Sequence, residues 1–188
     1  MIIIGITGTL GAGKGTVVEY LTSYCGFVHF SVRAFITREL ERRGMPVNRD
    51  TLTALANEMR AKNSPSYIIE ELYEAAALED KNCIIESIRT PGEVAALRSK
   101  PDFFLLAVDA DPRIRFNRVR KRNSETDKVS FTTFINNEQR EMHSEDPNKQ
   151  NLAECIRQAD FVIENNGSME ELHEKTEEFL KFITHRNH

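Results

Sequence analysis

A glycine-rich segment between a strand pattern and a helix pattern constrains the fold of this chain more than any other feature. Residues 2–6, Ile-Ile-Ile-Gly-Ile, form the short continuous apolar run expected of a strand buried on both faces. A helical pattern follows at residues 14–24, and Gly-Thr-Leu-Gly-Ala-Gly-Lys-Gly-Thr, residues 8–16, lies between the two. A buried strand that turns through glycines into a helix indicates an α/β unit with a parallel sheet.

The rest of the chain repeats this alternation. Apolar runs predict further strands at 27–30, 83–86, 103–108 and 161–164. Helices are expected at 35–43, 48–62, from Ser66 onward, from Pro91, at 112–122 and at 169–183. The helical pattern weakens in the polar stretch 123–151. The pattern predicts an α/β fold with a five-stranded, mostly parallel sheet and helices on both faces.

The glycine-rich segment has the composition of a phosphate-binding loop. Glycines let several backbone N–H groups turn toward one phosphate, and the following helix N-terminus favours negative charge. Lys14 would reach the outer phosphates of a nucleoside triphosphate, and a hydroxyl near the helix start would serve Mg²⁺. The alternative is a plain glycine turn with an exposed lysine. We expect ATP to be bound by Gly8, Gly11, Ala12, Gly13, Lys14, Gly15 and Thr16.

The loop departs from the strict phosphate-loop pattern at one position, because Gly15 stands between Lys14 and the hydroxyl of Thr16. The loop by itself does not separate kinases from GTPases or ATPase motors. A GTPase would also carry an Asn-Lys-x-Asp guanine reader, whereas Asn148-Lys149 is followed by Gln150 and Asn151. This difference argues against a GTPase.

Composition limits the partners. The chain has 188 residues with 25 Lys and Arg against 29 Asp and Glu, a net charge of -4, which disfavours a nucleic-acid or membrane-surface binder. Its 3 cysteines form no ligand cluster, and its histidines show no paired ligand spacing. No run approaches the ~20 apolar residues of a membrane span. We expect a single cytoplasmic domain with a small-molecule partner.

Several motifs together resemble one family. Residues 8–16 are similar to the loop of adenylate kinases and related nucleoside monophosphate kinases. Glu-Ser-Ile-Arg at 86–89 resembles their Asp-Gly-x-Arg, and Arg-Phe-Asn-Arg-Val-Arg-Lys-Arg at 115–122 resembles their lid helix. Ala-Asp-Phe-Val-Ile-Glu-Asn-Asn-Gly-Ser at 159–168 resembles a motif of dephospho-CoA kinases and of archaeal dephospho-CoA-kinase-like proteins. The resemblance implies a P-loop kinase fold with an acceptor-binding helical arm at about 31–80 and a lid at about 113–150.

The resemblance also implies roles for residues after the third strand. Glu86 would hold Mg²⁺, directly or through water, or orient the acceptor; the family usually has aspartate here, and the alternative is a solvated strand end. Arg89 resembles the arginine that clamps the acceptor phosphate, since guanidinium binds a phosphoryl group in a bidentate manner. Asp109 ends the fourth strand, in a position similar to that of Glu86. A role in the site and a structural role in the following turn are equally compatible with this position.

Three arginines of the arm are candidates for acceptor binding. Arg33 and Arg38 lie where the family carries such an arginine, although the Gly-Asp that usually precedes it is missing here. Arg60 resembles an arginine of the archaeal group. Each is equally compatible with an ordinary exposed helix charge, so the sequence leaves the choice among Arg33, Arg38 and Arg60 open.

The densest positive charge lies in the expected lid. Arg115, Arg118 and Arg122 follow at i, i+3 and i+7 and share one helix face. Such a stripe can close over a triphosphate and stabilise the transferring group, chiefly through Arg118 and Arg122. The alternatives are a solvated face or an RNA-binding patch. By resemblance, Asn166 and Gly167 would contact adenine, largely through backbone groups.

These expectations define a phosphotransferase that moves the γ-phosphoryl group of Mg-ATP to a small acceptor. Its catalytic residues would be Lys14, Arg118, Arg122 and Glu86, with Thr16 and Glu86 near Mg²⁺. Dephospho-CoA, a nucleoside monophosphate and a non-nucleotide metabolite all remain open as acceptors. An alternative is a nucleotide-dependent switch or assembly ATPase that acts on a protein or RNA. The sequence predicts no oligomeric state.

Overall fold

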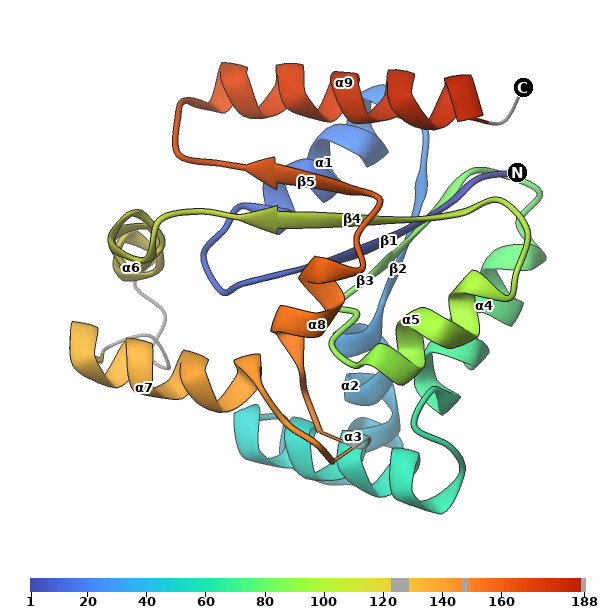
Figure 1. Cartoon of the computed structure of the whole chain (residues 1–188). Helices are drawn as coiled ribbons and strands as arrows, with labels where there is room; N and C mark the ends of the chain where they lie inside the picture. The colour runs from blue at the N-terminus through green and yellow to red at the C-terminus, as the bar shows by residue number, and fades with distance from the viewer. Residues whose placement is uncertain (123–128, 147–148, 187–188) are drawn as a thin grey trace.

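A parallel sheet forms the centre of the molecule (Figure 1). The computed structural model describes residues 1–122, 129–146 and 149–186. Within them the sheet has 5 strands in the order β2-β3-β1-β4-β5, and every pairing is parallel. The strands are β1 (Ile3–Gly8), β2 (Val28–Ser31), β3 (Cys83–Glu86), β4 (Phe103–Asp109) and β5 (Phe161–Glu164). The predicted α/β sheet is confirmed, with the glycine-rich loop leaving from its central strand.

Helices cover both faces of the sheet (Figure 1). One face is covered by α1 (Lys14–Cys25) and α9 (Met169–Arg186). On the other side lie α2 (Val32–Arg42), α3 (Arg49–Lys62), α4 (Tyr67–Ala77), α5 (Pro91–Arg98) and α8 (Leu152–Arg157). The region 31–80 that was expected to form an acceptor arm therefore contains α2, α3 and α4.

The apolar run of β1 supplies both cores. Ile3 packs among residues from α2–α5, whereas Ile4 packs among residues from α1 and α9. Both side chains are 0% exposed. Burial of one such side chain stabilises the fold by ~2 kcal/mol. A strand covered on both sides must be apolar at successive positions, which explains why β1 reads as a continuous run.

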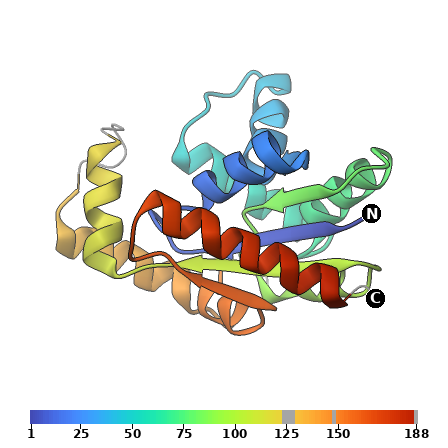
Figure 2. The same ribbon diagram turned by 90° about the horizontal axis from the view of Figure 1, so that it is seen from above.

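Two helices lie beyond the carboxyl ends of β4 and β5. They are α6 (Pro112–Lys121) and α7 (Phe131–Met142), and Figures 1 and 2 show them at the same end of the molecule as the glycine-rich loop. In open α/β sheets, ligands bind at the carboxyl ends of the strands. The fold therefore brings α6, α7 and the loop together at the edge where a site is expected.

Side-chain caps set several helix boundaries. Asn48 forms a capping box with Thr51 at the start of α3, as the sequence suggested. Ser168 accepts a hydrogen bond from the N–H of Glu171 at the start of α9. The second helix begins earlier than expected, because the Ser31 side chain accepts a hydrogen bond from Ala34 N–H and caps α2 directly after β2.

Helix α7 lies within the polar stretch 123–151, where the helical pattern weakens. Ser130 caps this helix by accepting a hydrogen bond of 3.1 Å from Thr133 N–H. The ring of Phe116 on α6 lies 5.3 Å from the ring of Phe131 and 5.5 Å from that of Phe134. Phe134 is the buried residue of the helix. Phe131, Phe134 and Ile135 lie at i, i+3 and i+4 on one face of α7, and the two phenylalanines pack against Phe116 of α6.

The cysteines and the possible metal ligands among the described residues bear on two further classes of chemistry, reactive thiols and metal binding. Burial raises the pKa of the Cys155 thiol to about 12, which disfavours a reactive thiolate at neutral pH. No group of His, Cys, Asp and Glu side chains in the described part of the chain is arranged to bind a metal by itself. None of the helices described there combines the length and the apolar character needed to cross a membrane.

Candidate functional site: the phosphate loop and its cations

The glycine-rich loop turns so tightly that a side chain would clash at its first glycine and at Gly13. Gly8 has φ 132° and Gly13 has φ 108°, in the region that favours glycine. A Cβ on Gly8 would lie 2.0 Å from the Val108 carbonyl oxygen, and one on Gly13 would lie 2.4 Å from Asn165 Nδ2. Ala12, between the glycines, is 0% exposed. The loop is thus packed against β4 and against the segment that follows β5.

Lys14 begins α1 and bends back over the loop. Its Nζ donates hydrogen bonds to the carbonyl oxygens of Gly8, at 2.8 Å, and Thr9, at 2.7 Å. Thr16 lies in the first turn of the same helix, where its N–H donates to Gly13 O at 3.0 Å. The ammonium group and the hydroxyl-bearing residue are therefore both held at the helix N-terminus, where the partial positive charge favours an anion.

Several charged groups act on Lys14. Burial is the main cause that lowers its pKa to about 8, and the positive charge of Arg89 comes next. The Glu86 carboxylate opposes this shift, while Arg122 and Arg115 lower the pKa further. The fold therefore brings Lys14, Glu86, Arg89 and Arg122 together from separate parts of the chain. A buried lysine whose charge is disfavoured by burial and by neighbouring arginines is typical of a site that binds an anion.

The low pKa of Lys14 predicts that triphosphate binding weakens in alkali. A bound polyphosphate stabilises the ammonium form, but in the free protein this form is lost above about pH 8. MgATP affinity should therefore fall roughly tenfold between pH 7 and pH 9, the loss expected when one proton must be taken up on binding. Isothermal titration calorimetry across this range tests the prediction, and a constant affinity would contradict it.

The effect of Lys14 on folding has the opposite sign. Its pKa is about 8 in the folded protein, against an ordinary value of 10.5, so the unfolded chain binds more protons between these values. The contribution of Lys14 to stability therefore rises with pH across that window. Urea unfolding of the free protein at pH 8 and pH 10, compared with Lys14→Ala, would separate this contribution from other alkaline titrations.

Gly15 differs from the other loop glycines, because a Cβ at this position would meet nothing within 4 Å. Packing within the protein therefore does not require glycine here, although glycine weakens a helix by ~0.5–1 kcal/mol relative to alanine. The free space beside the helix N-terminus matches the place where a phosphate would approach.

Gly15→Ala is therefore expected to stabilise the protein by ~0.5 kcal/mol and to weaken MgATP binding. Gly92→Ala is a matched control, since Gly92 is likewise the second residue of its helix and a Cβ there would make an ordinary contact of 3.5 Å with Pro65. Urea unfolding and calorimetry measure both effects. If Gly15→Ala binds MgATP as tightly as Gly92→Ala, the space beside α1 is not part of the phosphate site.

Glu86 lies at the carboxyl end of β3, next to β1. Its Oε2 is 2.9 Å from Nε2 of His29 on the edge strand β2. This hydrogen bond is the main cause that lowers the pKa of Glu86, and the charges of Lys14 and Arg89 add to it. The carboxylate is therefore ionised at neutral pH, in a position to interact with an acceptor or a hydrated cation. Its role at Mg²⁺ stays a prediction.

Of the two lid arginines expected to be catalytic, Arg118 lies on the last turn of α6 and Arg122 is its C-cap residue. Nη1 of Arg118 is buried and has no hydrogen-bond partner among the described residues. Burial, followed by the positive charge of Arg122, lowers the pKa of Arg118. A buried guanidinium N–H without an acceptor costs free energy. An anion that bridged Arg118 and Arg122 would relieve both this cost and the repulsion.

Arg89 follows β3 and is braced on several sides. Its Nη1 donates to Oε1 of Gln150 at 2.9 Å, and Glu141 of α7 lies 3.8 Å from the same nitrogen. The backbone N–H of Arg89 donates to Glu93 Oε2 at 2.8 Å. The guanidinium is therefore oriented by α7 and by the segment before α8. Its role as an acceptor clamp stays a prediction.

Arg60 contacts Arg89 indirectly, through the carboxylate of Glu93. It is 5% exposed, and its Nη2 donates to Glu93 Oε1 at 3.0 Å. The other oxygen of the same carboxylate accepts the backbone N–H groups of Arg89 and Thr90. Nε of Arg60 is buried without a partner among the described residues. The Glu93 carboxylate thus lies between Arg60 and the backbone of Arg89 and binds both.

A cavity of about 550 Å³ lies between α2, α3 and α4, in the expected acceptor arm. Phe35, Met59 and Tyr67 contribute apolar and aromatic wall, and Arg38 lines the same cavity. Other charged residues there are paired with each other: Glu39 accepts from both Arg42 and Arg43, and Glu58 from Arg43 and Lys62. Arg33 is exposed and is not among the residues that line it.

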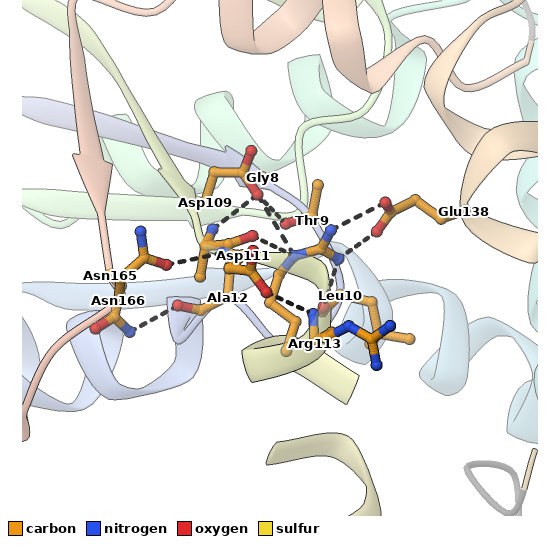
Figure 3. Close-up of polar contacts among 12 residues, drawn as sticks. Gly8, Thr9, Leu10, Ala12, Asp109, Asp111, Arg113, Glu138, Asn165 and Asn166 are labelled. Carbon is orange, nitrogen blue, oxygen red and sulfur yellow. Dashed lines mark hydrogen bonds and ion pairs between the residues drawn. The ribbon is translucent and has the colours of Figure 1, made fainter. Parts of the chain in front are cut away.

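The segment that follows β5 contacts the loop through side chains as well as backbone. Asn165 Nδ2 donates to Ala12 O at 2.7 Å, and Asn166 Oδ1 accepts the N–H of Asp111 at 2.7 Å. Figure 3 shows both asparagines beside Ala12 and the start of α6. Gly167 continues this turn. Contact of Asn166 and Gly167 with adenine stays a prediction.

Sequence reasoning left the role of Asp109 open and missed the contacts of three other residues of this region, His29, Asn165 and Glu138. Asp109 has a structural role, because its Oδ1 accepts from Thr9 Oγ1 at 2.5 Å and from Ala110 N–H at 2.8 Å. His29 contacts Glu86 although its sequence context is that of an ordinary strand residue. Asn165 stood within a recognised motif, which was a usable signal. Glu138 of α7 pairs with Arg115, an interaction between two helices that the sequence does not show.

Comparisons with known proteins agree with this fold. The chain is 28% identical over 187 residues to a UPF0200 protein of Methanothermobacter thermautotrophicus, covering 99% of this chain and 93% of the relative. A shikimate kinase from Bacteroides thetaiotaomicron has a TM-score of 0.64 at 14% identity, covering 96% of this chain and 98% of that one.

A dephospho-CoA kinase from Campylobacter jejuni has a TM-score of 0.56 at 15% identity, covering 96% of each chain. These structures share the fold of this chain. A profile described as the AAA domain (AAA_18) matches residues 4–146, from β1 through α7. Because that match includes the phosphate loop and most of the chain, the protein belongs to the AAA domain family, with the fold of the P-loop kinases.

Proposed function

We propose that the protein is a small-molecule kinase that transfers the γ-phosphoryl group of Mg-ATP to an acceptor bound in the α2–α4 arm. The observation that carries the proposal is the group of cations around the loop. The charges of Arg89 and Arg122 both act on Lys14, and Arg118 presents a buried N–H without an acceptor among the described residues. A triphosphate supplies negative charge to all of them.

The residues divide into three tasks. Lys14 and the loop N–H groups bind the triphosphate at the helix N-terminus. Arg118 and Arg122 stabilise the charge that spreads over the transferring phosphoryl group, which is most of what this reaction requires. Arg89 and Glu86 orient the acceptor between the loop and the arm. No protein nucleophile is needed for direct in-line transfer.

The site fits Mg²⁺. Thr16 offers a hydroxyl in the first turn of α1, and Glu86 offers an ionised carboxylate on the strand beside β1. Hydroxyl, carboxylate and water oxygens are the ligands that Mg²⁺ prefers. When bound, the ion neutralises charge on the outer phosphates. Thr16 and Glu86 are therefore the residues that would hold it, Glu86 through water or directly.

The cavity in the arm suits an acceptor that combines a ring with an anionic group. Aromatic walls from Phe35 and Tyr67 favour stacking with a planar ring, and Arg38 favours a phosphate or carboxylate. Of the three arm arginines, Arg38 is thus the best candidate for contact with the acceptor. Nucleoside monophosphates and dephospho-CoA have this chemistry, and so does a cyclic hydroxy acid such as shikimate.

A panel assay tests the proposed reaction. ADP release from Mg-ATP is measured with each nucleoside monophosphate, dephospho-CoA, shikimate and no acceptor. We expect one class of acceptor to raise ADP release well above the acceptor-free rate, with Arg38→Gln raising the KM for that acceptor. Equal ADP release with and without every acceptor would reject the kinase and favour the ATPase switch.

A further inference from the structure

Two side chains outside the glycine-rich loop hold carbonyl oxygens inside it. Arg115 Nη1 donates to Leu10 O at 3.2 Å, and Asn165 Nδ2 donates to Ala12 O at 2.7 Å. These two carbonyls belong to alternate peptides of the loop. In a trans peptide the C=O and the next residue's N–H point in opposite directions. Holding Leu10 O and Ala12 O therefore turns the N–H groups of Gly11 and Gly13 the other way.

Arg115 is fully engaged in this contact. The residue is 2% exposed, and its Nε donates to Ala110 O at 2.7 Å. Its Nη1 and Nη2 also form a bidentate ion pair with Glu138 of α7. Figure 3 shows the Glu138 carboxylate directed toward the loop residues Thr9 and Leu10. Unlike Arg118, this guanidinium has few N–H groups left for a ligand.

The loop glycines are shaped to this arrangement. Gly11 has φ 80°, and a Cβ there would lie 2.7 Å from the Arg115 carbonyl oxygen. Asn165, which is 5% exposed, packs directly on Gly13. Gly11 is thus packed against α6, and Gly13 against the segment between β5 and α9. Preorganised N–H groups bind an anion without the cost of reorienting the backbone.

We propose that Arg115 and Asn165 are positioning residues that preorganise the phosphate loop by holding its Leu10 and Ala12 carbonyls. Glu138 keeps Arg115 in place, which makes phosphate binding depend on the docking of α7. Arg115 thus has a different task from Arg118 and Arg122 on the same helix. The inference rests on the proposed function only in that the loop binds the phosphates of a nucleotide.

The experiment measures binding of Mg-ATP and of sodium tripolyphosphate, which has neither base nor ribose. Asn165→Asp keeps the shape of the side chain but replaces the donor with an acceptor that repels Ala12 O. Arg115→Lys keeps the charge but cannot hold two carbonyls and Glu138 together. We expect each variant to bind both ligands roughly tenfold more weakly, the loss typical of one charge-assisted hydrogen bond. Titrations are made well below the unfolding midpoint of every variant.

Arg98→Gln is the matched control. Arg98 also holds a carbonyl, that of Gln158, and a carboxylate, that of Asp160, but on the segment before β5 instead of the loop. It should lower the unfolding midpoint without changing either affinity. Glu138→Gln is a second route to the same test if Arg115→Lys does not fold, with a smaller loss of affinity expected.

The inference is overturned if Asn165→Asp and a folded Arg115 or Glu138 variant bind both ligands as tightly as the wild type. It is also overturned if Arg98→Gln loses as much affinity as they do. Either result would leave these residues a purely structural role. A lowered unfolding midpoint in these variants, with no loss of affinity, would also overturn the inference. Wild-type protein that binds neither ligand would instead reject the proposed function. Wild-type protein that binds both but phosphorylates no acceptor would reject the kinase reaction alone.

Discussion

Lys14→Ala should weaken Mg-ATP binding by about a hundredfold or more, since it removes a charge-assisted contact with the outer phosphates. In the free protein Nζ of Lys14 lies against the carbonyls of Gly8 and Thr9, at 2.8 and 2.7 Å. Burial disfavours its charge and lowers its pKa to about 8. The substitution should therefore cost little stability, so that the loss is one of binding.

Calorimetry with Mg-ATP at pH 7 measures the affinity, and urea unfolding checks the fold. Lys81→Ala is the control, because Lys81 is an exposed lysine in the turn before β3, away from the loop. If Lys14→Ala keeps the affinity of the wild type, the loop does not bind a triphosphate and the proposed function fails at its first step.

Arg118→Ala should reduce the rate of phosphoryl transfer by 10²- to 10³-fold, roughly the range found when a donor to a developing negative charge is removed. Its buried Nη1 has no partner among the described residues, and the charge of Arg122 opposes its own. The free protein should therefore unfold at the same midpoint or slightly higher. Lost activity with retained or increased stability is the signature of a residue kept for function.

The rate is measured with the acceptor that the panel identifies, and the unfolding midpoint by thermal denaturation. Lys121→Ala is the control on the same helix, since Lys121 is exposed next to Arg122. A normal rate in Arg118→Ala would mean that Arg118 does not act on the transferring phosphoryl group.

The backbone layout was largely predictable from sequence for a simple reason. Strands covered on both faces must be apolar at successive positions, and β1, β3 and β4 show this directly. Caps such as Asn48 and Thr90 mark helix starts through local hydrogen bonds. Helix α7 escaped prediction because its few apolar positions lie within a polar stretch, and its contacts with α6, through Phe116 and the Arg115–Glu138 pair, are tertiary.

The candidate site was predictable only in part. Loop glycines and Lys14 are adjacent in sequence, so their chemistry can be read locally. The stripe of arginines could be placed on one helix face, and its catalytic role was expected chiefly of Arg118 and Arg122, but the sequence did not show what Arg115 contacts. They differ because α7 supplies Glu138 to the first, whereas nothing described in the structure pairs with Nη1 of the second.

The sequence by itself determined the five strands and most of the helices along the chain, and the presence of a phosphate-type loop after the first strand. Both depend on local backbone and burial patterns. Only the tertiary structure decided which side chains reach that loop. Asn165 and Arg115 hold its carbonyls from more than a hundred residues away, and Arg60 serves Arg89 through Glu93. Contacts of this kind are set by how the elements pack, which no short stretch of sequence records.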